Sequence, residues 1–393
     1  MRTVLTAKRL LTPSEIVEEP VVVLEDGAIV SITSRTHGEL PGGQHVEFPD
    51  CTLIPALFDV HIHGSGGHDV MEATDGALNR IGAFLARRGV GSYLATTVTA
   101  PLDFLLRSLS GLAKLLEKPL EGARPLGIHL EGPFLSPHKR GAHAESQLLP
   151  PSVELFERMW QAAEGHIRLM TIASELPGAE ETIAHASKLG VRISLGHSDA
   201  DAAAAQRGVR AGAVTATHTF NAMRAFDHRS PGLLGEVLTN DALFAELICD
   251  GLHVDPAAVR LWWKAKGAER GLLVTDAMAA AGMPDGPYRL GELDVRVEKG
   301  RVLIGEGTLA GSTLTLDRGV RNFMKFTGAS LADAAALATR NPARMTGFDG
   351  EVGTLKAGRS ADIAVLSANN EVIETLLRGR ACLAETGPVS FNG

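Results

Sequence analysis

Five short apolar runs in this chain of 393 residues are each followed by side chains that could bind a metal ion or move a proton. These side chains belong to His61, His63, Glu131, His197, His218 and Asp276. Neutral imidazole suits Zn²⁺ and Fe²⁺, and carboxylates serve as ligands or as general acids and bases. The recurrence of such residues after successive apolar runs predicts a metal-dependent hydrolase more specifically than any single motif could.

The elements that must position these residues are eight short apolar segments with the character of strands buried on both faces. They cover 53–60, 91–98, 124–130, 167–173, 191–196, 212–217, 243–249 and 271–276. Segments with a helical pattern, such as 102–118 and 179–190, lie between most of them. This alternation predicts an α/β fold, a (β/α)₈ TIM-like barrel, in which catalytic groups lie at the carboxyl ends of the strands. All six candidates fall at such ends.

Both ends of the chain carry further strand-like pieces, such as VVVLEDGAIVSI near the start and VGTLKAGRSADIAVLS near the end. Neither piece alone has enough strands to cover a sheet face. We therefore expect a small β-sandwich domain built from both chain termini, comprising residues 1–51 and 352–393. The barrel is expected to span residues 52–351.

Composition argues against several classes of protein. The net charge of −8, from 46 acidic and 38 basic residues, gives no support to nucleic-acid binding, which usually needs a clustered basic face. Three widely spaced cysteines argue against a disulfide framework and suit a reducing cytoplasm. The chain shows no adequate apolar stretch for a signal peptide or a membrane span, so we expect a soluble cytoplasmic protein without a membrane partner.

The pair His61 and His63 lies in DVHIHGSGG. Side chains alternate in an extended segment, so both imidazoles point to the same side and can reach one cation. The alternative is that one or both histidines only form hydrogen bonds at a strand end. The histidines and carboxylates that recur after later strands favour the metal site.

Glu131 lies in GIHLEGPFLSPHKRGAH, where the third strand should end. Its carboxylate could ligate one metal or bridge two, and the following glycines and prolines predict a rigid loop, the kind of segment in which binding residues concentrate. His143 closes this loop. It could donate a hydrogen bond to a substrate carbonyl, although a lone loop histidine is often only solvated.

The remaining candidates follow later strands, in LGHSDAD, ATHTFNAM and VTDAMAAAG. Ser198 or Asp199, which follow His197, could simply cap the next helix, but no such local role explains His197 or His218. Asp276 is placed to shuttle a proton beside a metal centre, and a buried structural carboxylate is the alternative. The glycine-rich segment 277–312 is a candidate to close over a substrate, with Leu309 as a possible contact for an acetyl group.

The motifs HIHG, HLEGPF, GHSDA, HTFNAM, DGLHVDP, LVTDAM and LAGS, in this order, resemble the amidohydrolase superfamily and, within it, deacetylases of N-acetylated sugar phosphates. The resemblance covers nearly the whole chain, and HLEGPF together with HTFNAM is its most specific part. It implies hydrolysis of the acetamide of N-acetylglucosamine 6-phosphate to glucosamine 6-phosphate and acetate.

The resemblance also implies roles for individual residues. The metal ligands common to the family match Glu131, His197 and His218, the catalytic acid and base matches Asp276, and the group that polarises the acetamide carbonyl matches His143. The positions that hold the sugar phosphate match Asn221, Ala222, Arg229 and His253. In relatives some phosphate contacts come from a neighbouring subunit, which implies a homodimer.

The number of metal ions divides the family. Some members replace both histidines of the first motif and hold a single metal, whereas this chain retains His61 and His63. We therefore expect a divalent cofactor, Zn²⁺ or Fe²⁺, with one or two ions per chain. With two, Glu131 would be the bridging carboxylate, since no lysine lies at a comparable strand end.

Two alternatives stay open. The substrate could be N-acetylgalactosamine 6-phosphate or another N-acyl amine, because the motifs do not reveal a single epimeric hydroxyl. The chain could also be a non-catalytic scaffold of the same fold. A scaffold would be expected to lack one or more ligands, and here the whole set is present together with Asp276.

Overall fold

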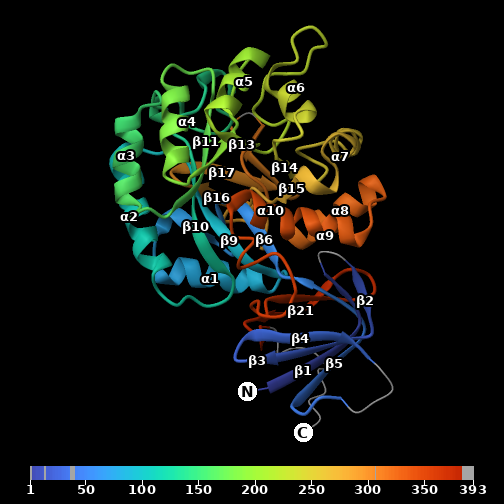
Figure 1. The fold of residues 1–393 in the computed structure, drawn as a ribbon. Coiled ribbons are helices and arrows are strands. Elements are labelled where there is room, and N and C mark those ends of the chain that lie inside the picture. The colour runs from blue at the N-terminus through green and yellow to red at the C-terminus, as the bar shows by residue number, and fades with distance from the viewer. Residues whose placement is uncertain (1, 13–14, 36–39, 306, 383–393) are drawn as a thin grey trace.

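A computed structural model describes residues 2–12, 15–35, 40–305 and 307–382. Its centre is a ring of eight parallel strands, which confirms the predicted (β/α)₈ barrel (Figure 1). The strands are β6 (Leu57–Ile62), β9 (Val90–Thr97), β10 (Arg124–Glu131), β11 (Ile167–Ile172), β12 (Arg192–Leu195), β13 (Ala213–Ala216), β14 (Ala245–Ile248) and β15 (Gly271–Val274). Each predicted run overlaps one of them, and β6, β9 and β10 extend one or two residues beyond their runs. The first run, 53–60, also includes the end of the preceding strand β5 (Gln44–Pro55).

Backbone hydrogen bonds close the ring. Six strands pair side by side in the order β13-β12-β11-β10-β9-β6, and β14 pairs with β15. The Phe244 N–H donates to the Val214 carbonyl over 2.9 Å, which joins β13 to β14. The Asp276 N–H donates to the His61 carbonyl over 2.9 Å, which joins β15 to β6. The carboxyl ends of all eight strands therefore surround one point.

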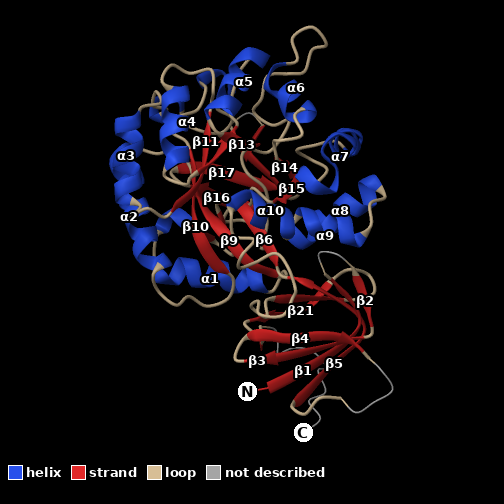
Figure 2. Ribbon diagram, in the orientation of Figure 1, coloured by secondary structure: helices blue, strands red, loops and turns tan. Residues whose placement is uncertain are grey.

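Helices surround the ring on the outside (Figure 2). They are α1 (Asp75–Ala86), α2 (Leu102–Leu116), α3 (Val153–Ala162), α4 (Ala179–Lys188), α5 (Ala202–Ala211), α6 (Gly232–Thr239), α7 (Pro256–Arg270), α8 (Leu316–Thr327), α9 (Leu331–Leu337) and α10 (Arg340–Thr346). Short 3₁₀ turns occur at Val70–Glu72, Pro137–Lys139 and Glu145–Gln147. No helix in the described residues combines the length and apolar character needed to cross a membrane.

The two ends of the chain form one mixed sheet beside the barrel, as predicted (Figure 1). Its strands are β1 (Arg2–Leu11), β2 (Ile16–Glu18), β3 (Pro20–Glu25), β4 (Ala28–Ser34), β5, β20 (Ile363–Leu366), β21 (Val372–Leu377) and β22 (Arg380–Ala381). Its apolar core, which includes Leu5, Leu53 and Ile363, is separate from the core of the barrel. The boundaries 1–51 and 352–393 stay a prediction, and residues 383–393 lie outside the described residues.

A second, antiparallel sheet follows Asp276. Its strands are β16 (Gly286–Leu290), β17 (Leu293–Glu298), β18 (Arg301–Ile304) and β19 (Thr308–Leu309). Val295, Val297 and Val302 pack into the barrel core. This sheet occupies the segment 277–312, which the sequence indicated only as a glycine-rich cover, and residue 306 within it lies outside the described part of the chain. A two-residue pair, β7 (Gly64–Ser65) with β8 (His68–Asp69), follows β6.

Candidate functional site

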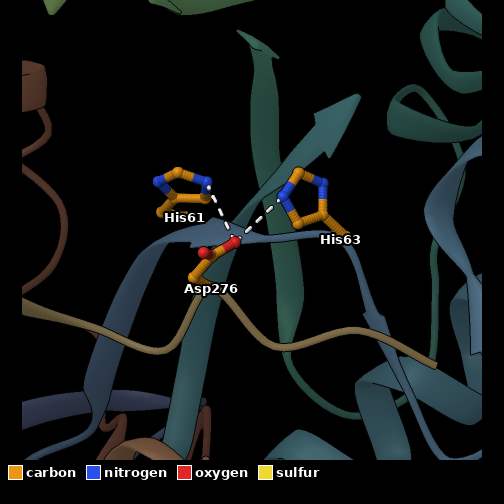
Figure 3. A group of neighbouring side chains, drawn as sticks. All are labelled: His61, His63 and Asp276. Carbon is orange, nitrogen blue, oxygen red and sulfur yellow. Dashed lines mark ion pairs between the residues drawn. The ribbon is translucent and has the colours of Figure 1, made fainter. Parts of the chain in front are cut away.

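The six candidate residues named first meet at the carboxyl ends of the barrel strands. Glu131 is the central member, because its Oε1 lies 3.2 Å from His197 Nε2 and 3.3 Å from His218 Nε2. Its Oε2 lies 3.2 Å from His63 Nε2. On the other side, Asp276 Oδ1 lies 3.1 Å from His63 Nε2 and 3.4 Å from His61 Nε2. Dashed lines mark both pairs in Figure 3.

The strand ends hold several of these residues in an unusual backbone conformation. His197, His218 and Asp276 each lie two residues beyond the end of a strand and have positive φ angles of 46°, 28° and 51°. Left-handed backbone is costly for residues other than glycine, and it gathers at functional sites where the surrounding structure enforces it. The hydrogen bond from the Asp276 N–H to His61 is one such constraint. The geometry therefore aims these side chains inward.

Hydrogen bonds at Nδ1, the ring nitrogen that points away from the cluster, fix the orientation of three histidine rings. His63 Nδ1 lies 3.1 Å from the Thr96 carbonyl oxygen, and His197 Nδ1 lies 2.9 Å from the Lys139 carbonyl oxygen. A carbonyl oxygen only accepts, so each neutral ring carries its hydrogen on Nδ1 and presents a lone pair at Nε2. His61 follows the same rule, because its Nδ1 lies 3.1 Å from a carboxylate oxygen of Glu246.

These lone pairs point toward carboxylate oxygens. Both a lone pair and a carboxylate oxygen are hydrogen-bond acceptors, so a neutral ring cannot form a hydrogen bond to the carboxylate through this nitrogen. His61 Nε2 and Glu131 Oε1 are buried and have no hydrogen-bond partner within the described part of the chain. A positive charge between them would turn mutual repulsion into attraction. The donor set of imidazole nitrogen and carboxylate oxygen is the one that Zn²⁺ and Fe²⁺ prefer. The residues present therefore fit a divalent cation.

Electrostatics within the cluster also favour a positive charge at its centre, here in the form of protons on the His61 and His63 rings. Burial favours the neutral ring of His61, but the carboxylates of Glu131 and Asp276 outweigh it and raise the pKa of His61 well above its ordinary value. For His63 the same opposition raises the pKa to about 9. Burial would raise the carboxyl pKa values, yet the charge of His61 and hydrogen bonds from histidines hold the pKa of both Glu131 and Asp276 well below the ordinary range. The carboxylates are ionised at neutral pH.

The possible ligand atoms fall into two groups. His61, His63 and Asp276 form one, and their ligand atoms lie within 4.8 Å of one another (Figure 3). Glu131, His143 and His197 form the other. His218 joins this second group, since its Nε2 lies 3.0 Å from His197 Nε2. Glu131 contacts both groups, so the geometry allows either one cation or a bridged pair.

His143 belongs to the second group by distance, but its hydrogen bonds suit another role. The Thr99 N–H donates to His143 Nδ1 over 3.2 Å, and the Thr99 hydroxyl lies 2.7 Å from the same atom. A backbone N–H only donates, so Nδ1 accepts and the hydrogen of the neutral ring is on Nε2. A metal ligand would need a lone pair there. His143 therefore faces the site as a hydrogen-bond donor.

Gly132 in the HLEGPF motif makes room for Thr99. Its φ is +85°, and a Cβ at this position would overlap the Thr99 hydroxyl. Only glycine meets both conditions without strain. The motif thus places Glu131 at the strand end while leaving space for the residue that orients His143.

The cluster opens into a cavity of about 380 Å³. Of the predicted substrate contacts, its lining includes His143, Asn221, Ala222, His253 and Leu309. Leu290, Leu293 and Arg301 of the antiparallel sheet also line it, so the segment after Asp276 forms part of the cavity wall. A larger hollow of about 850 Å³ lies at the terminal sheet, but neither group of possible metal ligands lines it.

Two predicted phosphate contacts differ in their surroundings. His253 is largely buried, and its Nδ1 lies 2.6 Å from Asp250 Oδ2. Burial lowers the pKa of His253, but Asp250 outweighs it and leaves that pKa above its ordinary value, so a cationic ring is favoured. Arg229 is exposed and is not among the residues that line the cavity of this chain. The structure therefore does not bring Arg229 to the cluster.

Buried residues outside the predicted set of site residues complete the site. Glu246 on β14 contacts His61, and Asp59 on β6 accepts a hydrogen bond of 2.6 Å from the Thr275 hydroxyl next to Asp276. His129, on the same strand as Glu131, is buried between the hydroxyls of Thr96 and Thr171. A single carboxylate inside an otherwise apolar strand was the available signal for Glu246 and Asp59.

Comparisons with known proteins agree with this geometry. A model of the amidohydrolase family matches residues 52–382. The chain is 37% identical over 374 residues to an N-acetylglucosamine-6-phosphate deacetylase of Bacillus subtilis (strain 168), covering 94% of each chain. It is 38% identical over 381 residues to an N-acetylgalactosamine-6-phosphate deacetylase of Escherichia coli O157:H7, covering 97% of this chain and 99% of the relative.

A solved structure gives the same result for the fold. It is a mutant N-acetyl-D-glucosamine-6-phosphate deacetylase of Mycobacterium smegmatis in complex with N-acetyl-D-glucosamine-6-phosphate. The two chains share 35% identity and superpose with a TM-score of 0.92, covering 97% of this chain and 99% of the other. The likeness thus includes both the barrel and the sheet formed by the termini.

Proposed function

The chain belongs to the amidohydrolase family, and from this premise we propose that it hydrolyses the acetamide of N-acetylglucosamine 6-phosphate to glucosamine 6-phosphate and acetate. The observation that carries the proposal is the cluster of histidines around Glu131, with Asp276 beside it, in the wall of a cavity. The non-catalytic alternative is disfavoured because every group that the chemistry needs is present and buried.

A secondary amide needs an activated water, stabilisation of the oxygen that becomes negative, and a proton for its nitrogen. A divalent cation held by Glu131, His197 and His218 would supply Lewis acidity toward water and carbonyl. Asp276 is ionised, so its carboxylate can accept a proton as the water oxygen attacks the carbonyl carbon. It can then return that proton to nitrogen as the C–N bond breaks, which releases the amine and acetate.

His143 contributes the hydrogen bond to the carbonyl. Its Nε2–H is fixed by the two contacts with Thr99 at Nδ1. A donor that is already oriented stabilises the developing negative charge without reorganising during the reaction. The ring lies against the edge of His197, with centroids 4.7 Å apart, so the carbonyl would be held next to the cation.

The sugar and its phosphate would occupy the outer part of the cavity. Asn221 and Ala222 follow His218 in the sequence and line the cavity together with His253, whose pKa is raised by Asp250. Leu309 on β19 lines the cavity and is proposed to contact the acetyl group. Arg229 is proposed to contact the phosphate of a substrate bound in a neighbouring subunit, which requires the predicted homodimer.

Arg229→Ala should reduce kcat/KM for the phosphorylated substrate by about 10- to 100-fold, the equivalent of one lost hydrogen bond to a charged group, mainly through KM. The measurement is steady-state kinetics on N-acetylglucosamine 6-phosphate and on unphosphorylated N-acetylglucosamine. Arg296→Ala on β17 is the matched control, because this exposed guanidinium pairs with Glu298 and does not line the cavity. An equal loss on both substrates would remove Arg229 from the phosphate site.

The retained His61 and His63 suggest a second cation, bridged to the first by Glu131. We expect metal analysis of protein prepared with Zn²⁺ or Fe²⁺ supplied to give between one and two ions per chain, with the excess over one lost in His61→Asn. Mass spectrometry of metals, normalised to protein concentration, measures this ratio. A firm ratio of one that His61→Asn leaves unchanged would rule out the second site.

N-acetylgalactosamine 6-phosphate is the second candidate substrate, because a relative with 38% identity carries that name. Acetate release from the gluco and galacto phosphates and from unphosphorylated N-acetylglucosamine separates the possibilities. Strong preference for the gluco phosphate supports the first proposal, and preference for its epimer supports the second. Equal turnover without phosphate would discard His253 and Arg229 as specificity residues.

The proposed setting is the cytoplasm. The three cysteines, Cys51, Cys249 and Cys382, are all free thiols in the structure, which suits a reducing compartment. Zinc or iron as the native metal, the homodimer and the domain boundaries at residues 51 and 352 belong to the same proposal.

A further inference from the structure

Glu246 is a fully buried carboxylate on β14. This barrel strand lies between β13, which is followed by His218, and β15, which is followed by Asp276, and it supplies no predicted metal ligand. Its Oε2 lies 3.1 Å from His61 Nδ1 and accepts the backbone N–H of His218 over 3.3 Å. Its own carbonyl accepts the N–H of Thr219 over 2.8 Å. One residue thus contacts His61 from the first group of ligands and the strand end that carries His218 from the second.

A buried carboxylate is costly unless it is paired and fully hydrogen-bonded. Among the described residues, Glu246 Oε1 has no hydrogen-bond partner, and the ion pair formed by Glu246 is with His61. Stability alone gives no reason for a charge at this position, because the rest of β14 is apolar and buried. A role in orienting His61 gives one.

Three histidine rings are oriented by a hydrogen bond at Nδ1, and they differ in the group that accepts this hydrogen bond. His63 and His197 donate to neutral carbonyl oxygens, whereas His61 donates to a charged carboxylate. A carboxylate holds the Nδ1–H tautomer more firmly than a carbonyl does and makes the opposite nitrogen a stronger ligand. His61 Nε2, the atom 3.4 Å from both Glu131 and Asp276, would gain most from such a partner.

We propose that Glu246 is the positioning residue of His61 and sets the affinity of the His61–His63–Asp276 group for a divalent cation. The carboxylate keeps the hydrogen on Nδ1, directs the Nε2 lone pair toward Glu131 and Asp276, and ties this arrangement to the backbone at His218. The inference rests on the proposed metal-dependent function, but its test measures metal binding and does not depend on turnover.

The test is calorimetric titration of Zn²⁺ into the metal-stripped full-length protein. His61→Asn first identifies the class of sites that needs His61. Glu246→Ala should weaken that same class by about 10- to 100-fold, the usual effect of removing such a partner. Glu246→Gln keeps an oxygen acceptor without the charge, so a smaller loss is expected. Asp317→Asn is the control, since Asp317 is a buried carboxylate on α8 that pairs with Arg321.

Three results would overturn the proposal. The isotherm of Glu246→Ala could match that of the wild type, or both classes of site could weaken equally, or His61→Asn could leave Zn²⁺ binding unchanged. Circular dichroism of each variant shows whether it is folded, and if Glu246→Ala does not fold, an unchanged isotherm for folded Glu246→Gln refutes the role of the charge. A protein that binds Zn²⁺ as expected but releases no acetate would contradict the proposed function and leave this inference standing.

Discussion

Asp276→Asn should lower kcat by about 10²–10⁴-fold, the range that a positioned acid or base contributes. The carboxylate is the group proposed to take the proton of the attacking water and return it to the amide nitrogen, and an asparagine amide can do neither. Its Oδ1 also lies 3.1 Å from His63 Nε2, so we expect a small change in the metal affinity of the group formed by His61, His63 and Asp276. Glu131, His197 and His218 should still hold their cation.

The measurement is kcat together with metal content for wild type and Asp276→Asn. Asp317→Asn, which removes a buried carboxylate outside the site, should keep full activity. If Asp276→Asn turned over at near the wild-type rate with its metal in place, the carboxylate would not be the acid and base. A loss of all metal would instead make Asp276 an essential ligand.

Glu131→Gln should remove both the metal and the activity. Glu131 contacts His197 and His218 through Oε1 and His63 through Oε2, so it serves both groups of possible ligands. The substitution deletes the negative charge and places amide hydrogens among nitrogens that should coordinate a cation. Because partners outside the ligand set already change affinity by about 10–100-fold, we expect at least about 100-fold weaker binding here.

Metal content after dialysis and acetate release measure this prediction together. Glu157→Gln is a matched control, because Glu157 on α3 also pairs with a histidine, His185 on α4, away from the site. That variant should bind metal and turn over like the wild type. Retention of a full metal complement in Glu131→Gln would show that Glu131 is not a ligand.

The barrel could be predicted from the sequence because its strands are buried on both faces and therefore form short, unbroken apolar runs. The position of Glu131, at the last residue of β10, followed from the same pattern. Strands β16 to β19 were harder to foresee. In β17, buried Val295 and Val297 alternate with exposed polar residues such as Arg296, and glycines nearby gave the segment the character of a loop.

Long-range contacts explain what else was missed. Glu246 acts on a histidine 185 positions away in the sequence, and its own neighbours indicate only a buried strand. The donor role of His143 depends on Thr99, which lies 44 positions earlier. Arg229 is the reverse case. The resemblance to the family assigned it to the phosphate site, but in the structure of the single chain its side chain is exposed. Local pattern predicts elements well, whereas hydrogen-bond partners across the barrel require the structure.

The most direct test of the central proposal is acetate release from N-acetylglucosamine 6-phosphate by the purified full-length protein. It should be measured as prepared, after removal of metal by a chelator, and after Zn²⁺ or Fe²⁺ is restored. We expect acetate and free amine in equal amounts, loss of both on chelation, and recovery with metal. No acetate with any metal, or full activity in protein shown to be metal-free, would contradict the account.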